Sequence, residues 1–144
     1  MPEPLEMYDL SVPVEDGLAT VERCAQALAD AGVNIDAVNY SAAQDVKSIH
    51  LLVHDGVDAA GVLERALSAG VTCRPVHVYT LPNRPGILAR YAGALVDAGL
   101  AIEFMYQATA KGVVVAAPDL DAVRAVFADA ARNDSDQPAA SPSN

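Results

Sequence analysis

The chain has 144 residues, 52% of them hydrophobic and 5% aromatic, and this size suits one ordinary domain or two small ones that share a core. A net charge of −10, with no cluster of lysine and arginine to offset it, repels nucleic-acid phosphates, so we expect no nucleic-acid partner. Charged residues interrupt every apolar run before it reaches the roughly 18 residues of a membrane helix, so we expect no membrane partner.

The first half of the chain predicts two strand-and-helix alternations. Residues 7–14 alternate in part and end at a turn, which indicates a strand. From Leu18 the apolar residues fall at helical spacing and stop at Gly32, a typical helix C-cap. Residues 33–41 and 46–53 are typical of two strands. A second helical stripe, closed by Gly70, consists of Ala59, Val62, Leu63, Ala66 and Leu67.

The second half predicts the same order of elements. Residues 71–81 are extended, and Pro75 suggests a sheet edge or a bulge there. A helix carries Leu88, Tyr91, Ala92 and Leu95, and strands are expected at Ala101–Ala108 and Lys111–Ala117. The last helix carries Leu120, Val123, Phe127 and Ala130. Residues 133–144 have no periodic apolar positions, so we expect a disordered tail.

The two halves also resemble each other in sequence. The segment ALADAGVNI, residues 27–35, aligns with ALVDAGLAI, residues 94–102, and the same offset pairs Asp36 with Glu103. The order is therefore strand-helix-strand-strand-helix, a linking extended segment, and the same order again. This pattern predicts an α+β fold with two ferredoxin-like units in tandem, whose antiparallel sheets carry helices on one face. We place the units at residues 1–72 and 73–132.

The second unit lacks a clear last strand of its own. Either the extended segment near residues 71–82 serves both units, or a partner chain completes the sheet. An uncovered sheet edge favours association, and we therefore expect a homodimer.

A turn before the helix of the second unit carries the most informative motif. It has the sequence NRPGIL at residues 83–88, followed by DAGLAIEFMY at residues 97–106. This combination resembles the ACT domain, a small regulatory module that binds amino acids in many enzymes of amino-acid metabolism. The resemblance covers residues of about 7 to 131 and implies a stand-alone tandem ACT protein. The first unit has VEDGLATV at the corresponding turn, without the Pro-Gly pair.

The chemistry of the second turn suits a carboxylate. Asn83 is a good helix N-cap, Pro85 suits the first helical turn, and Gly86 lets a ligand approach the backbone. Free N–H groups at a helix start favour an anion, and Arg84 can add a charge-assisted contact. The candidate ligand-binding residues are Leu81, Asn83, Arg84, Pro85, Gly86, Ile87, Leu88, Tyr40, Met105 and Tyr106. The same sequence also suits an ordinary strand-to-helix turn without a ligand.

The corresponding residues of the first turn, Glu15 and Asp16, would repel a carboxylate but could hold an ammonium group. Tyr40 and Tyr106 lie one position apart in the repeat alignment. They could line a pocket between the units, although aromatic strand residues more often serve packing.

The other reactive side chains predict no catalytic or metal site. His50 and His54 are too few to form a metal site without more ligands. Cys24 falls near the helical stripe and is most simply a small core residue. Cys73 lies beside Arg74 and could be a thiol of lowered pKa. The N-terminal sequence MPEPLEMYDL lacks the features of a signal peptide, which predicts a cytoplasmic protein with reduced thiols.

The leading hypothesis is a non-enzymatic regulatory module that binds a small amino acid at the interface between units and needs no cofactor. One alternative is a separately encoded regulatory subunit that acts mainly through contacts with an enzyme of amino-acid metabolism, which co-purification would reveal. A second alternative is a small enzyme that uses Cys73 or a histidine, since the fold does not exclude catalysis. Turnover abolished by Cys73→Ser would support this last hypothesis.

Overall fold

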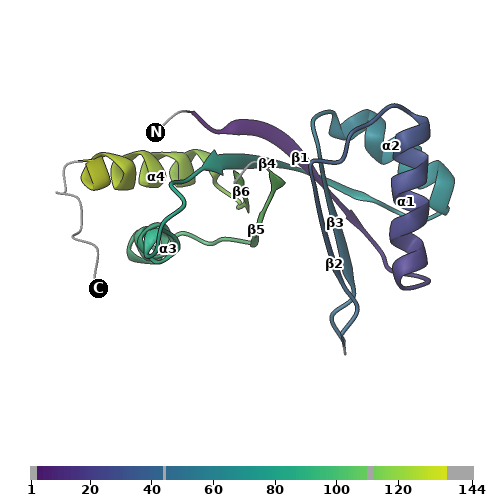
Figure 1. Ribbon diagram of the computed structural model, residues 1–144, viewed down its shortest axis with the longest axis horizontal. Coiled ribbons are helices and arrows are strands. Elements are labelled where there is room, and N and C mark those ends of the chain that lie inside the picture. Colours follow the sequence, from purple (N-terminus) through teal and green to yellow (C-terminus); the bar gives the residue numbers. More distant parts are fainter. Residues whose placement is uncertain (1–2, 44, 110–111, 136–144) are drawn as a thin grey trace.

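A computed structural model describes residues 3–43, 45–109 and 112–135. Residues 134 and 135 are described by their backbone alone. The described residues form six strands and four helices (Figure 1). Their order is β1 (Leu5–Val12), α1 (Leu18–Asp30), β2 (Ala37–Ser41), β3 (Ser48–Val53), α2 (Gly56–Leu67), β4 (Thr72–Thr80), α3 (Ile87–Asp97), β5 (Phe104–Gln107), β6 (Gly112–Ala116) and α4 (Leu120–Ser135). Each predicted helix and strand is present. None of the described helices has the length and apolar character needed to cross a membrane.

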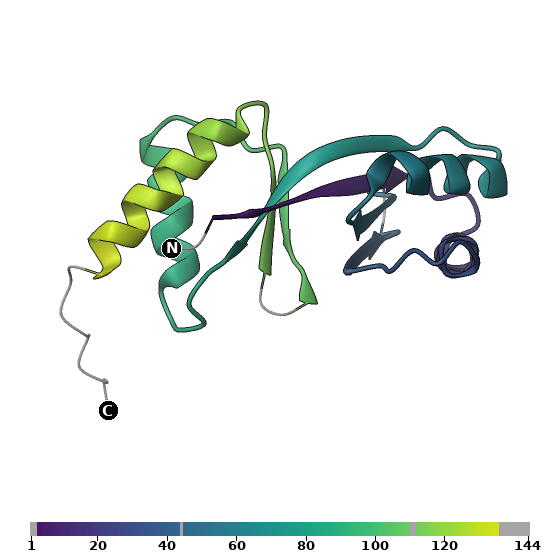
Figure 2. The ribbon, with the colours of Figure 1, turned by 90° about the horizontal axis from the view of Figure 1, so that it is seen from above.

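The strands form one antiparallel sheet in the order β2-β3-β1-β4-β6-β5. Strands β1 and β4 pair with each other from Leu5 opposite Val78 to Ser11 opposite Thr72. Strand β1 also pairs with β3, and β4 also pairs with β6. Figure 2 shows these two long strands running between the helix pair α1 and α2 at one end and the pair α3 and α4 at the other. The halves therefore share their two central strands.

This sharing explains how the second half completes its sheet. Its strand order is β5-β6-β4-β1, and the first half has the equivalent order β2-β3-β1-β4. The extended segment near residues 71–82 does serve both halves, as one of the two predicted solutions required, but β1 also serves both. No partner chain is needed to supply the last strand, so the argument that we made for a homodimer from a missing strand is wrong.

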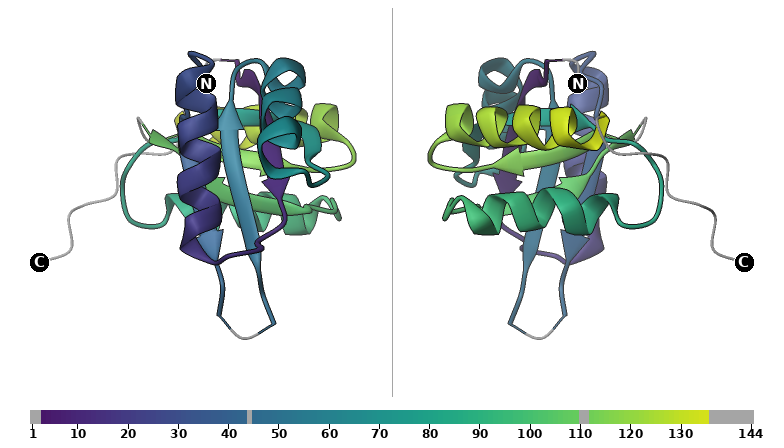
Figure 3. Two further views of the ribbon diagram at one scale, coloured as in Figure 1. Left: turned by 90° about the vertical axis from the view of Figure 1, so that its right-hand side faces the viewer. Right: turned by 90° about the vertical axis from the view of Figure 1, so that its left-hand side faces the viewer.

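Three clusters of buried side chains stabilise this arrangement. Helices α1 and α2 cover one cluster, with Leu10 and Leu51 from the sheet, and α3 and α4 cover a second one around Phe127. The third cluster lies on the helix-free side of the sheet and joins Leu52 of the first half to Val114 of the second. Figure 3 shows that strands β2 and β3 of the first half run across the direction of β5 and β6 of the second.

Equivalent hydrogen bonds end the first helix of each half. After α1, the Val33 N–H donates to the Leu28 carbonyl at 2.8 Å, and after α3 the Leu100 N–H donates to the Leu95 carbonyl at 3.2 Å. In each case the preceding glycine has a positive φ, 74° at Gly32 and 68° at its counterpart in the second half. These are the hydrogen bonds and the left-handed glycine of a Schellman cap. The glycines therefore end both helices for the same physical reason.

Two local predictions are refined by the structure. Pro75 lies opposite Tyr8 of β1, but the pairing of β4 with β6 begins only at His77, so the proline faces no second partner strand. The ladder with β1 runs through it without a bulge. Helix α4 extends to Ser135, so the tail predicted from residue 133 starts too early. Residues 136–144 of that predicted tail lie outside the described residues.

Tyr79, a buried residue of the second cluster, should make the stability of the protein depend on pH in the alkaline range. Burial raises the pKa of Tyr79 to about 12, against the opposing charge of Arg124, while the Glu3 and Asp121 charges add to the increase. An unfolded tyrosine titrates near pH 10. Because the folded pKa is the higher one, this contribution to stability is complete below about pH 10 and is lost as the pH rises from there toward 12.

We therefore expect the free energy of unfolding to fall between about pH 10 and pH 12, and to fall less steeply in Tyr79→Phe. Urea titrations at closely spaced pH values measure both slopes. Burial, together with the hydrogen bond to Asp9 and its charge, also raises the pKa of Tyr106, so the substitution should not remove the whole slope. Equal slopes for the wild type and Tyr79→Phe would contradict the prediction.

Candidate functional site

The predicted Pro-Gly turn is a type II β-turn that leads into α3. The Ile87 N–H donates to the Arg84 carbonyl at 3.4 Å, and Gly86 has φ 89° and ψ −13°. These angles are those of the third residue of a type II turn, which favours glycine, and proline is favoured at the second. The helix begins at Ile87 with Gly86 as its N-cap, so Asn83 is not the cap and Pro85 precedes the first helical turn.

This geometry leaves backbone donors at the start of α3. The Arg90 N–H donates to the Gly86 carbonyl at 3.0 Å, which is the first regular hydrogen bond of the helix. The N–H groups of Leu88 and Ala89 lie before it and have no intrahelical acceptor within reach. Gly86 has nothing within 4 Å of the position that a Cβ would occupy. The turn therefore presents open space and a partial positive charge together.

A pocket of about 310 Å³ opens beside this turn. It is lined by residues from the end of β4, from the turn and the start of α3, from β5 and from β6. These residues are Leu81, Pro82, Asn83, Arg84, Ile87, Leu88, Met105, Tyr106, Gln107 and Val113. This volume is at the lower end of the range for ligand pockets, which suits a small molecule.

The structure brings most of the predicted ligand-binding residues to this pocket. Pro85 and Gly86 form the adjacent turn but do not line the pocket, and Tyr40 lies in the first half of the molecule. Sequence reasoning missed Pro82, Gln107 and Val113. Strand pairing places Gln107 opposite Val113, and two-residue periodicity from Met105 could have identified Gln107.

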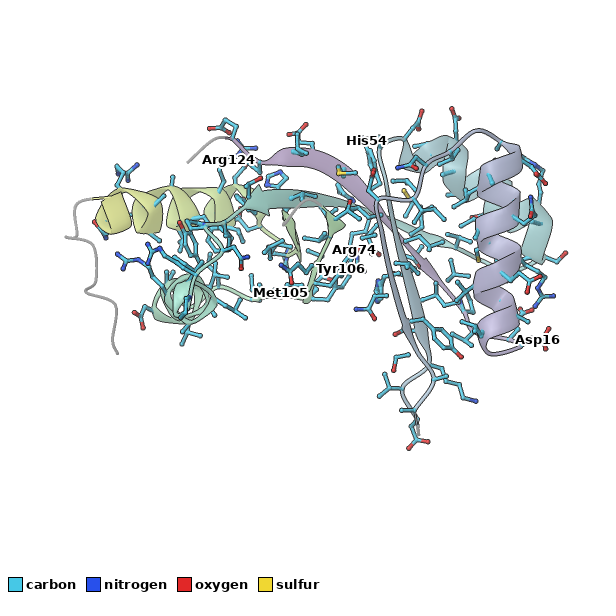
Figure 4. All side chains as sticks on the ribbon, viewed as in Figure 1. Asp16, His54, Arg74, Met105, Tyr106 and Arg124 are labelled. Atoms are coloured by element: carbon cyan, nitrogen blue, oxygen red, sulfur yellow. The ribbon has the colours of Figure 1, made fainter. Side chains whose placement is uncertain are left out.

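Tyr106 connects the pocket to the centre of the sheet. Its hydroxyl donates a hydrogen bond of 2.6 Å to Asp9 Oδ2 on β1, and the Asp9 side chain is 0% exposed. Ser11 Oγ donates to Asp9 Oδ1 at 2.9 Å, and His50 Nδ1 lies 3.0 Å from the same oxygen. Figure 4 shows Met105 and Tyr106 where the two halves meet. The buried carboxylate thus holds the Tyr106 side chain in one position.

The turn before α1 has a different conformation. Gly17 has φ 57° and ψ −134°, and the Ala19 N–H donates to the Asp16 carbonyl at 3.2 Å, as in a type II′ turn. Thr20 Oγ1 accepts hydrogen bonds from the Glu15 and Asp16 N–H groups at 3.2 and 2.9 Å. The first turn therefore uses a side chain of its own helix to satisfy donors, and it carries acidic groups that oppose an anion.

The first turn also differs from the second in its neighbours, which are Tyr40 and the ion pair of Asp16 with Arg23. The Tyr40 hydroxyl lies 3.5 Å from the position that a Cβ of Gly17 would occupy. Its counterpart in the second half is Gln107, because the Asp36 and Glu103 N–H groups make matching hydrogen bonds of 2.8 Å at the start of each hairpin. Asp16 pairs with Arg23 at 2.8 Å, and Figure 4 shows Asp16 beside α1, far from Met105.

No cysteine or histidine of the described residues lines the pocket beside α3. Nowhere among the described residues do three or more His, Cys, Asp or Glu side chains gather as a metal site would require. Burial raises the pKa of Cys73, and the negative charges of Asp9 and Asp55 raise it further. The possibility of a thiol of lowered pKa is therefore wrong, and the neighbouring Arg74 pairs with Glu103 at 2.6 Å. Cys24 is buried, as predicted for a core residue.

No protein-family model matches the sequence, and no curated protein sequence matches it either. Solved structures do share the fold. A protein from Bacteroides thetaiotaomicron matches with a TM-score of 0.69 and 23% identity over 88% of each chain. The ligand-free regulatory subunit of aspartate kinase from Thermus thermophilus matches with a TM-score of 0.63 and 18% identity, over 90% of this chain and 97% of that one.

The same fold also occurs within a longer enzyme chain. An allosteric aspartate kinase from Clostridium acetobutylicum matches with a TM-score of 0.62 and 13% identity, over 91% of this chain and 33% of that one. Proteins with this fold therefore include a separate regulatory subunit and a part of a whole kinase. The chain has the α+β fold of aspartate kinase regulatory subunits, with four helices against a six-stranded antiparallel sheet.

Proposed function

We propose that the chain is a non-enzymatic regulatory module of the cytoplasm, built from two ACT-like units, that binds a small α-amino acid beside its second turn. The observation that carries this proposal is the pocket of about 310 Å³ against the start of α3. It coincides with the Pro-Gly turn that resembles the ACT motif. The unit boundary near residue 72 stays a prediction, because β4 begins at Thr72 and pairs within both halves.

The carboxylate of the ligand would lie against the start of α3. The N–H groups of Leu88 and Ala89 point out of the helix start, and the helix dipole favours a negative charge there. Arg84 lines the same pocket and adds positive charge. The side-chain amide oxygens of Asn83 and Gln107 can accept hydrogen bonds from the ligand's ammonium group.

Occupancy would be communicated through Tyr106. This residue lines the pocket and also donates to Asp9, which lies within hydrogen-bond distance of His50 on the first half of the sheet. A ligand that binds one arrangement of the two halves more tightly than another would shift the balance between them. A partner enzyme of amino-acid metabolism could sense that shift.

A thermal-shift screen of the full chain against the common amino acids tests the proposal. A ligand at 100 times its dissociation constant adds about 2.7 kcal/mol to the free energy of unfolding, which is readily detected. We expect a rise in melting temperature with at least one α-amino acid. No rise with any of them at millimolar concentration would contradict the proposal.

Substituting Gly86 tests the position of the site. Because φ is 89° and the space beside Gly86 is open, Gly86→Val strains the turn and places a side chain at the ligand's approach. We expect amino-acid affinity to fall tenfold or more, about 1.4 kcal/mol, by calorimetry. Arg84→Ala should cost less, since an exposed ion pair contributes only about 0–1 kcal/mol.

Gly99 provides the matched control. It also has a positive φ, 68°, and open space at the Cβ position, but it follows the opposite end of α3. Gly99→Val should therefore show similar backbone strain and unchanged affinity. Undiminished affinity in a folded Gly86→Val protein would place the ligand elsewhere.

A regulatory subunit that acts mainly through protein contacts is the second candidate. The observation in its favour is that the separate regulatory subunit from Thermus thermophilus has the same fold over 97% of its length. Co-purification of an enzyme of amino-acid metabolism with the tagged chain, without any added ligand, would support it.

We also propose that the chain forms a homodimer. The sheet ends at β2 and β5, two edge strands that have one neighbour each within the described residues. Edge strands can pair with another chain, and a second copy beside β5 would extend the walls of the pocket. Sedimentation should show a dimer at micromolar concentration, and a monomer throughout that range would contradict this.

A further inference from the structure

The walls of the pocket beside α3 restrict which side chain its ligand can carry. Six of the residues that line it are apolar: Leu81, Pro82, Ile87, Leu88, Met105 and Val113. The others are Asn83, Arg84, Tyr106 and Gln107. The described lining thus contains one charged side chain, a cation, and neither aspartate nor glutamate.

The Tyr106 hydroxyl and the Asp9 carboxylate are already engaged with each other. The Tyr106 hydroxyl donates to Asp9 at 2.6 Å, and the Tyr106 side chain packs with the third cluster. Asp9 is the acidic group in contact with that wall, but its side chain is 0% exposed and is also bonded to Ser11 and close to His50. A second ammonium group on a ligand could not reach this carboxylate without displacing these contacts.

A charged ligand side chain would therefore be poorly matched. An ammonium or guanidinium group would lose its water without gaining an acidic partner. A second carboxylate would compete with the α-carboxylate for Arg84, the one cation of the described lining. An aliphatic side chain has no charge whose hydration would be lost in the same place. Each methylene that it buries increases affinity roughly fourfold. Selectivity would then come from the penalty on charged competitors as well as from apolar contact.

We propose that this pocket selects α-amino acids with an uncharged aliphatic side chain, such as valine, leucine, isoleucine and methionine, over lysine, arginine, aspartate and glutamate. The inference rests on the proposed function, since it assumes that an amino acid occupies the pocket. The α-carboxylate would use the donors at the start of α3, and the side chain would lie against Leu81, Met105 and Val113. The volume of about 310 Å³ limits the length of that side chain.

Calorimetry of the full chain with a homologous series is the direct test. The series is alanine, 2-aminobutyrate and norvaline, followed by leucine, lysine and aspartate. We expect affinity to rise roughly fourfold with each added methylene, and lysine and aspartate to bind at least tenfold more weakly than leucine. Lysine or aspartate binding as tightly as leucine would overturn the inference while leaving the proposed function intact. Absence of binding by every amino acid would overturn both.

Two variants of one wall residue isolate the role of charge. Met105→Glu places a carboxylate in the apolar wall, and Met105→Gln places a neutral side chain of similar length there. We expect leucine to lose tenfold or more affinity in Met105→Glu, and lysine to bind this variant more tightly than it binds Met105→Gln. Circular dichroism confirms that both variants fold. Equal lysine affinity in the two variants would show that Met105 does not face the ligand side chain, and would overturn the assignment.

Discussion

Replacing Gly56 by alanine is expected to lower the free energy of unfolding by about 2–3 kcal/mol, the upper range for overpacking a core. Gly56 is the first residue of α2 and is buried against the sheet. A Cβ added there would lie 2.7 Å from Cys73 Sγ on β4 and would collide with Tyr8 Cβ on β1. Because a Cβ is fixed to the backbone, relief requires that α2 move away from the strands that both halves share.

Gly93 in α3 is the matched control for this substitution. It also lies within a helix, but nothing lies within 4 Å of its Cβ position. Gly93→Ala should raise stability by about 0.5–1 kcal/mol, because alanine has the higher helix propensity. Urea unfolding of both variants measures the difference. Two similar changes, in either direction, would show that α2 is not packed as closely on β1 and β4 as described.

Replacing Asp9 by alanine should be at least as damaging, with an expected loss of about 3 kcal/mol or more. Its side chain is 0% exposed, and it accepts hydrogen bonds from Tyr106 at 2.6 Å and from Ser11 at 2.9 Å. Removal leaves these donors and His50 without their acceptor in the region where the halves meet. Unsatisfied buried donors are costly, so the loss should exceed that of a simple truncation.

Asp16→Ala is the control for the Asp9 substitution. Asp16 also pairs with a cationic side chain, Arg23 at 2.8 Å, but its side chain is 65% exposed. Surface ion pairs contribute only about 0–1 kcal/mol, so this variant should remain close to wild type. Equal losses for the two aspartate variants, measured by urea unfolding, would contradict the structural role of Asp9.

The helices and the repeat could be predicted because their signals are local. Apolar residues at helical spacing and the glycines at 32 and 99 define α1 and α3, and the same capping hydrogen bonds follow both. That β4 serves both halves was one of two alternatives drawn from the sequence, but the sharing of β1 was not predicted. The pairing of Leu5 with Val78 joins residues that lie far apart in the sequence. The sequence pattern of each strand would also suit two separate units that lie side by side.

In the candidate site, too, the features set by neighbouring residues could be predicted, and the contacts between distant residues could not. The turn and the start of α3 were recognisable from the sequence NRPGIL. The N-cap was expected at Asn83, but because the turn is of type II the helix begins later and its N-cap is Gly86. The contact between Tyr106 and Asp9 crosses most of the chain, and no periodic pattern indicates it. Tyr40 and Tyr106 were considered together because they lie one position apart in the repeat alignment. The hydrogen bonds of Asp36 and Glu103 agree with that alignment, which pairs Tyr40 with Gln107.

Amide chemical-shift mapping of the isotopically labelled full chain during a leucine titration locates the bound amino acid residue by residue. We expect saturable shifts that are largest for the N–H groups of Leu88 and Ala89, with further shifts at Met105 and Gln107. The corresponding amides of the first turn, residues 18–20, should stay unchanged. Shifts centred on the first turn, or no saturable shift at the start of α3 with any amino acid, would contradict amino-acid binding beside the second turn.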